Sequence, residues 1–92
     1  MRYFIDLSKV NDREELHDEL EAALPLPAYY GRNLDALNDA LTAMAVYYPS
    51  CIFIIRGAEE AGRGGAGDDI RKLRRLCSRL EQEEENLLFI WE

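Results

Sequence analysis

The chain has 92 residues, of which 48% are hydrophobic, and its net charge at pH 7 is −7. This apolar fraction excludes a disordered chain, and the length accommodates one compact domain, residues 1–92, but not two. Because a domain of this size buries only about 60% of the surface of its unfolded chain, we expect no deep cofactor cavity. The composition therefore favours a function based on surface binding.

The apolar segments and the cysteines predict a cytoplasmic chain. The longest apolar run, residues 43–48, is far shorter than the roughly 20 residues of a membrane span. The first residues reach Asp6 without the apolar region of a secretory signal peptide. Two cysteines, Cys51 and Cys77, are too few for a disulfide framework and lack the spacing of a zinc site, so we expect two buried thiols.

The net charge conceals an uneven distribution. Residues 71–79 contain five bases and no acid, whereas the rest of the chain has 6 bases and 18 acids, a net charge of −12. A wholly acidic surface would favour a basic partner and exclude nucleic acid. Here a basic segment and an acidic remainder both have to be considered.

The first half of the chain predicts a strand and two helices. Residues 3–7 contain β-forming side chains, and a helix then begins near Asn11 and Asp12 and ends before Pro25. Residues 29–32 form a connecting loop, after which Asn33 caps a second helix that ends before Tyr48-Pro49. On this helix the buried side is predicted to be Leu34, Leu37, Leu41 and Met44, and the opposite side presents Asp35, Asn38, Asp39 and Thr42.

The second half predicts a strand, a glycine-rich connection, a helix and a last strand. Residues 51–55 are continuously apolar, which indicates a strand covered on both faces. Residues 57–67 are expected to be a flexible loop, and a helix follows from Asp68 with a buried side of Ile70, Leu73, Leu76, Cys77 and Leu80. With a strand at 87–91, the order predicts an α/β fold with a small three-stranded parallel sheet packed with helices.

The patterns that could support catalysis or cofactor binding are weak. Residues 62–67 match G-x-G-x-x-G, but they do not follow a strand directly, and Asp68 and Asp69 would repel a phosphate. His17 is the only histidine and is expected to be a solvated helical side chain, so no catalytic triad can form. The carboxylates of residues 83–85 are typical of a solvated face rather than a metal site. We therefore expect no enzymatic activity, no cofactor and no metal.

Two surfaces remain as candidate binding sites. The bases of residues 71–79 could contact phosphates, but residues 54–88 contain no aromatic side chain to stack on bases. Asp35 and Asp39 lie one helical turn apart, next to Tyr29 and Tyr30, which look exposed. Asp35 also has a structural explanation as an acid near a helix N-terminus. Anions flanked by rigid aromatic side chains are nevertheless expected on a surface that binds the basic cleft of a partner protein.

Residues 26–42 read Leu-Pro-Ala-Tyr-Tyr-Gly-Arg-Asn-Leu-Asp-Ala-Leu-Asn-Asp-Ala-Leu-Thr, and this segment resembles the barstar family of ribonuclease inhibitors. The resemblance implies a three-stranded parallel sheet with helices and a cis peptide at Tyr48-Pro49. It also implies that Tyr29, Asp35 and Asp39 contact a nuclease, with Gly31 and Asn33 shaping the loop and helix start. In this interpretation Asp39 mimics a phosphate, Asp35 accepts hydrogen bonds nearby and Tyr29 packs on the rim of the active site.

The chain departs from the family at two places. Asn38 stands where the family typically has tryptophan, and the basic residues 71–79 stand where its last helix contributes an acid. The leading hypothesis is a monomeric inhibitor that occludes the basic active-site cleft of an extracellular or co-encoded ribonuclease in a 1:1 complex. It uses Tyr29, Tyr30, Gly31, Asn33, Asp35, Asn38, Asp39 and Thr42. The alternatives are an immunity protein for a toxin that is not a ribonuclease and an RNA-associated regulator that uses residues 71–79.

Overall fold

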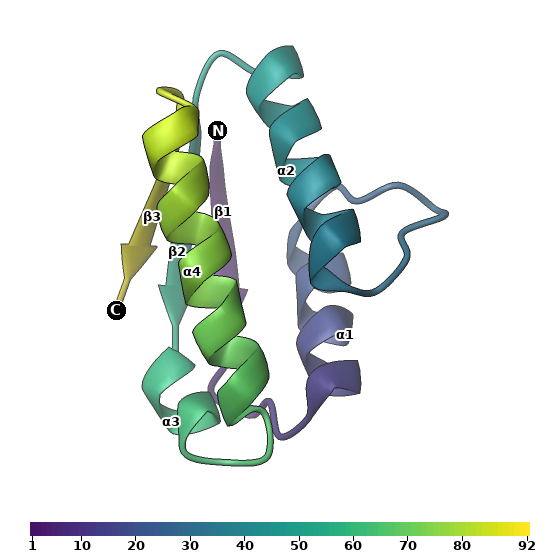
Figure 1. The fold of residues 1–92 in the computed structure, drawn as a ribbon, viewed down its shortest axis with the longest axis vertical. Helices are drawn as coiled ribbons and strands as arrows, with labels where there is room; N and C mark the ends of the chain where they lie inside the picture. Colours follow the sequence, from purple (N-terminus) through teal and green to yellow (C-terminus); the bar gives the residue numbers. More distant parts are fainter.

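The computed structural model describes residues 1–92 as a two-layer α/β domain (Figure 1). Its elements are β1 (Arg2–Asp6), α1 (Arg13–Ala23), α2 (Leu34–Tyr47), β2 (Cys51–Arg56), α3 (Ala58–Gly62), α4 (Gly67–Glu83) and β3 (Leu87–Trp91). The strands form one sheet of order β1-β2-β3, and both neighbouring pairs are parallel. The predicted three-stranded parallel sheet is therefore confirmed.

The helices cover one face of the sheet only, and the prediction that β2 is covered on both faces is wrong. Figure 1 shows α4 in front of the strands, with α1 and α2 beside them on the right. Toward the helices, the ring of Phe53 stacks on those of Tyr3 and Phe89 with centroids 5.5 and 4.7 Å away. Ile52 and Ile54 of β2 point to the other face and are half-buried. The strand order explains this, because two right-handed crossovers that advance in the same direction place their helices on the same side.

Side-chain caps set the starts of α1 and α2. The carboxylate of Asp12 accepts a hydrogen bond from the amide of Glu15 at 2.8 Å, while Glu15 accepts one from the amide of Asn11 at 2.8 Å. The side chain of Asn33 accepts a hydrogen bond from the amide of Ala36 at 2.7 Å. Both helices thus begin where the sequence predicts, because short polar side chains satisfy the free amides of the first turn.

The segment 57–67 is folded, which corrects the prediction of a flexible loop. It contains the short helix α3, and its three alanines, Ala58, Ala61 and Ala66, are buried in the core. Gly57 precedes α3 with φ of 78°, and a Cβ at this position would lie 2.3 Å from the amide nitrogen of Ser8. Only glycine fits there, so this residue is a requirement of the packing rather than a sign of mobility.

The peptide bond between Tyr48 and Pro49 is trans, which corrects the cis bond implied by the resemblance. Tyr48 adopts an extended conformation, φ −117° and ψ 141°, as steric contact with a following proline ring favours. The side-chain amide of Asn86 donates hydrogen bonds to the carbonyl oxygens of Ala45 and Tyr48 at 2.7 and 2.9 Å. These bonds satisfy two carbonyl oxygens at the C-terminal end of α2 while the Tyr48-Pro49 bond is trans.

Both cysteines are buried and free, as the sequence predicts. Burial raises the pKa of the Cys77 thiol to about 12, so this side chain stays a neutral part of the core. None of the helices has the length and apolarity that a membrane crossing requires.

Candidate protein-binding site

The outer side of α2 carries an acidic ridge, formed by Asp35, Asp39 and Thr42. All three side chains are exposed, and the opposite side of the helix buries Leu37, Leu41 and Met44 in the core. At about 100° per residue, positions 35, 39 and 42 fall on one side of the helix. The structure thus presents two carboxylates one turn apart on a rigid element.

Tyr29 lies at the tip of the loop before α2 and next to this ridge. Its side chain is 88% exposed, and it lines a groove of about 490 Å³ together with Asp39. The wall formed by α2 carries Ala40, Ala43 and Tyr47. The groove is open and mostly apolar, with one carboxylate, so a partner side chain that entered it would meet aromatic rings and Asp39.

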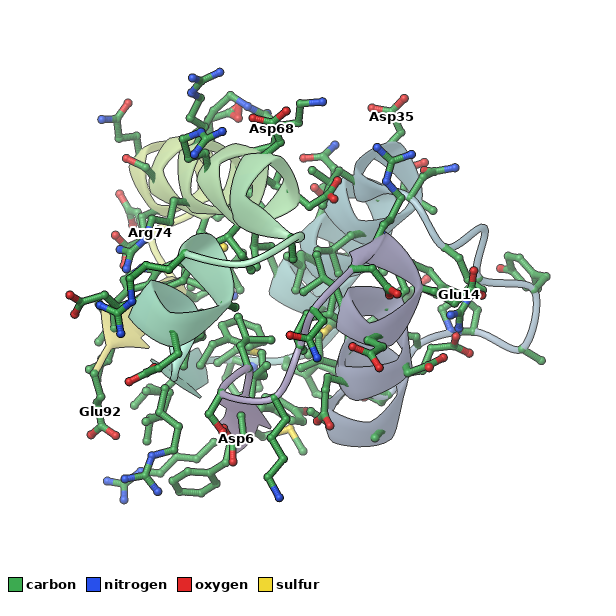
Figure 2. All side chains as sticks on the ribbon, turned by 90° about the horizontal axis from the view of Figure 1, so that it is seen from below. Asp6, Glu14, Asp35, Asp68, Arg74 and Glu92 are labelled. Carbon is green, nitrogen blue, oxygen red and sulfur yellow. The ribbon has the colours of Figure 1, made fainter.

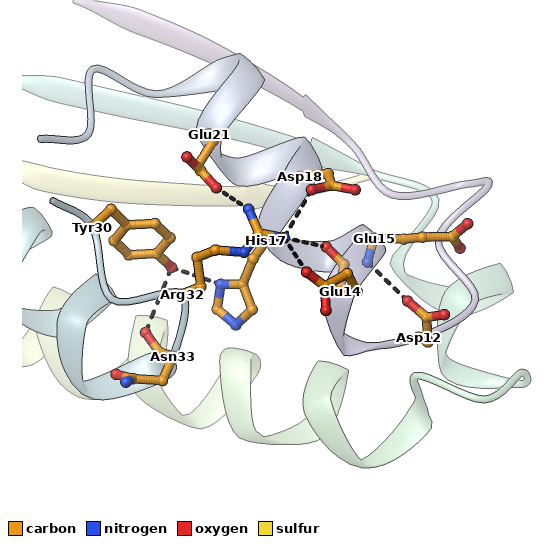
Figure 3. Close-up of polar contacts among 9 residues, drawn as sticks. All are labelled: Asp12, Glu14, Glu15, His17, Asp18, Glu21, Tyr30, Arg32 and Asn33. Atoms are coloured by element: carbon orange, nitrogen blue, oxygen red, sulfur yellow. Dashed lines mark hydrogen bonds and ion pairs between the residues drawn. The ribbon is translucent and has the colours of Figure 1, made fainter. Parts of the chain in front are cut away.

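Tyr30 is only 8% exposed, which corrects the expectation that both tyrosines lie on the surface. Its hydroxyl oxygen is 2.7 Å from Nδ1 of His17 (Figure 3). His17 is 1% exposed, so the prediction of a solvated histidine is also wrong. Burial raises the pKa of Tyr30 to about 12, and burial, followed by the charge of Arg32, lowers the pKa of His17. Tyr30 therefore anchors the loop to α1 rather than presenting its ring to a partner.

Arg32 holds the same loop against α1 through three carboxylates. Its guanidinium donates to Asp18 at 2.8 Å, to Glu14 at 3.2 Å and to Glu21, as Figure 3 shows. The hydrogen bond to Asp18, followed by that to Glu21, raises the pKa of the Arg32 side chain. The residue has φ of 54°, in the left-handed region. The turn that places Tyr29 beside α2 thus depends on a backbone conformation that the ion pairs help to hold.

Gly31 and Asn33 shape the start of α2. The amide nitrogen of the Asn33 side chain donates to the carbonyl oxygen of Gly31 at 3.3 Å, while its oxygen caps the helix. A Cβ at Gly31 would lie 3.4 Å from that of Ala36. Asn33 is therefore already occupied by local hydrogen bonds, whereas Gly31 is exposed beside Tyr29.

Asn38 faces α4 rather than the outer ridge. Its side-chain oxygen accepts a hydrogen bond from Arg79 at 3.0 Å. Asn38 and Asp35 line a second groove, of about 360 Å³, whose other wall consists of α4 side chains that include Lys72, Arg75 and Arg79. The sequence did not reveal that the basic residues lie directly beside the acidic ridge, because this requires the packing of α4 on α2.

Two exposed apolar residues of α2 were not among the predicted site residues. Val46 and Tyr47 are 74% and 80% exposed. Their positions could have been found by continuing the helical period, because Val46 follows Asp39 and Thr42 on the outer side and Tyr47 follows Ala40 and Ala43. The exposed side of α2 therefore extends one turn beyond the predicted residues.

The structure holds no group of three or more His, Cys, Asp or Glu side chains that is placed to hold a metal ion. The only histidine is buried, with its Nδ1 on the hydroxyl of Tyr30. What the surface offers is a rigid acidic helix beside an exposed aromatic ring, which is suited to recognition of a basic protein surface.

The chain is thus a small α/β domain with an exposed acidic and aromatic surface. Residues 1–91 match the family described as Barstar (barnase inhibitor), and the chain belongs to this family. The members of this family are inhibitors rather than enzymes. A relative from Bacillus subtilis (strain 168), named "Putative ribonuclease inhibitor YrdF", is 51% identical over 41 residues. That alignment covers 45% of this chain and 45% of the relative, so it spans less than half of either protein.

Proposed function

We propose that this protein inhibits a ribonuclease by placing the acidic ridge of α2 in a basic active-site cleft. The observation that carries the proposal is that Asp35 and Asp39 lie exposed on one side of a rigid helix, beside exposed Tyr29, in a member of the barstar family. The proposed contact residues are Tyr29, Gly31, Asp35, Asn38, Asp39 and Thr42. Tyr30 and Asn33 hold the loop and the helix start in place.

The mechanism is mimicry of the substrate's phosphate. Asp39 occupies the cationic site that binds the phosphate of RNA, and Asp35 accepts hydrogen bonds from neighbouring donors. Tyr29 packs on the rim of the cleft and excludes water. Opposite charges accelerate the encounter, and the loss of water around the paired groups strengthens their interaction in the complex. Inhibition needs no chemical step, because the bound helix leaves no room for RNA.

Inhibition of RNA cleavage tests the proposal, with barnase as the probe enzyme. We expect a stoichiometric amount of the protein to abolish cleavage in a 1:1 complex. Asp39→Ala should weaken binding by about 3 kcal/mol, roughly two orders of magnitude in Kd, because it leaves basic groups of the nuclease buried and unpaired.

Glu85→Ala is a suitable control for Asp39→Ala. It removes one exposed carboxylate that lines neither groove beside α2 and forms no ion pair, so inhibition should be unchanged. Unimpaired cleavage at excess protein, or equal affinity of Asp39→Ala and the unchanged protein, would show that the acidic ridge is not an inhibitory site.

An immunity protein for another toxin with a basic cleft would use the same acidic ridge. The two functions are therefore distinguished by which enzyme the protein inhibits. The proposal places the complex in the cytoplasm, where the protein would protect cellular RNA.

The RNA-associated regulator has less support, because three of the five bases in 71–79 already have partners. Arg71 pairs with Asp68, Arg79 pairs with Glu83, and the guanidinium of Arg74 lies 4.3 Å from the ring centroid of Trp91.

A further inference from the structure

The acidic ridge of α2 has a basic neighbour on one side only. Lys72, Arg75 and Arg79 lie on one side of α4, three and four residues apart, and line the groove that also contains Asp35 and Asn38. We call these three residues the basic flank. In Figure 2 Asp35 of α2 and Asp68 of α4 project on the same side of the molecule, so a partner that approaches this side meets both helices.

Two of the three side chains of the basic flank form no ion pair within the protein. Arg79 already donates hydrogen bonds to Asn38 at 3.0 Å and to Glu83 at 2.9 Å. Lys72 and Arg75 are exposed and take part in none of the seven ion pairs of the structure. Their charges are therefore available to a partner.

The two acids of the ridge have different surroundings as a consequence. Asp39 lines the aromatic groove, in which no side chain is basic. Asp35 lines the groove that contains Lys72, Arg75 and Arg79. It also lines a smaller groove that contains Lys72 and the ion pair between Arg13 and Asp69. The proposed binding surface is thus acidic and aromatic around Asp39, and its charge becomes positive beyond Asp35, toward α4.

We propose that the target carries carboxylates on the rim of its basic cleft, opposite Lys72 and Arg75. This inference rests on the proposed function. A target whose rim was basic throughout would place like charges against the basic flank when Asp39 entered the cleft, and such a juxtaposition disfavours binding. An acidic rim converts the same residues into attractive contacts, so the basic flank selects among nucleases that share a basic cleft.

A protein surface fits the basic flank better than RNA does. A strand laid along α4 would pass Asp35 and Glu83, whose charges oppose phosphate. The side chains that line the groove include no aromatic ring on which a base could stack. Carboxylates held at fixed positions on a folded protein avoid both problems.

A charge-swap experiment with two probe enzymes tests the inference. The probes are barnase and a barnase variant in which two exposed basic residues, on the side of the cleft that faces α4 when Asp39 is seated, are replaced by glutamate. At about 50 mM salt the unchanged protein should inhibit the acidic-rim variant at least about tenfold more strongly. The preference should shrink at about 0.5 M salt, where the charges are screened.

The double variant Lys72→Glu/Arg75→Glu should reverse this preference. The matched control is Arg2→Glu/Arg63→Glu, which changes the net charge equally at two exposed positions outside both grooves and should keep the preference. Equal inhibition of the two probes, or an unchanged preference in Lys72→Glu/Arg75→Glu, would overturn the acidic rim and leave the proposed function intact. Failure to inhibit either probe would overturn both, and salt-sensitive binding of a single-stranded RNA oligonucleotide would then assign the basic flank to nucleic acid.

Discussion

Tyr29 and Tyr30 are neighbours in the sequence, but their side chains have opposite surroundings. Tyr29 is exposed beside Asp39, and the hydroxyl of Tyr30 is buried against His17. Tyr30→Phe should lower the free energy of unfolding by about 1–2 kcal/mol, because it leaves a buried imidazole nitrogen without a partner. Tyr29→Ala should change stability by less than about 0.5 kcal/mol but weaken nuclease binding by about tenfold or more. Urea unfolding and inhibition assays on both variants measure this separation, and a stability loss in Tyr29→Ala would contradict it.

His17 should make the protein less stable at mildly acidic pH. Burial and the charge of Arg32 lower its pKa in the folded protein below the ordinary value of 6.5, although the carboxylates of Asp69 and Glu21 act in the opposite direction. The unfolded chain therefore binds a proton on His17 at a higher pH than the folded protein. The corresponding stability is complete above about pH 6.5 and is lost as the pH falls toward the lowered pKa.

Urea unfolding between about pH 7.5 and 5 measures this dependence. In His17→Gln, which cannot titrate, the part of the slope that begins near pH 6.5 should disappear. Equal slopes in the two proteins would mean that His17 has the same pKa in the folded and unfolded states.

At the scale of the elements, the loop between α1 and α2 depends on Arg32 in two ways. Its side chain pairs with Glu14, Asp18 and Glu21, and its backbone has φ of 54°. Arg32→Ala and Arg32→Gly both remove the ion pairs, but only glycine adopts this φ without a steric cost. We therefore expect Arg32→Gly to be more stable than Arg32→Ala by about 1 kcal/mol, the reverse of their order within a helix. Thermal unfolding of both variants decides the point, and a more stable alanine variant would show that the loop has rearranged.

The elements show which parts of the fold can be predicted from local sequence. Asp12 and Asn33 cap α1 and α2 where the pattern indicates, because capping involves residues three positions apart. The acidic ridge was predictable for the same reason, since it follows the helical period. The helix α3 was missed because glycines surround the alanines that it buries. The contact between His17 and Tyr30, and the position of Lys72 beside Asp35, join separate elements and have no local signal.

At the scale of the whole molecule, the sheet has one covered and one open face. The continuous apolar sequence of β2 suggested two covered faces, but the number of layers depends on the direction of both crossovers and not on one strand. On the open face Phe4 is 67% exposed, and Leu88 and Ile90 are exposed on β3. The proposed inhibitory surface lies on the helical layer, so substitutions on the open face of the sheet should not alter it.

The two-layer architecture predicts opposite effects for two phenylalanines of the same sheet. Phe53 is fully buried under the helices and stacks on Phe89, so Phe53→Ala should cost about 3–5 kcal/mol of stability through lost packing and a cavity. Phe4 lies in the neighbouring strand β1, where it pairs with Ile54 on the open face. Phe4→Ala should therefore lower the free energy of unfolding by no more than about 1 kcal/mol. Urea unfolding at low protein concentration measures both. A loss of several kcal/mol in Phe4→Ala would mean that something covers this face in solution, whereas a small loss leaves Phe53 and its neighbours as the sole core of the domain.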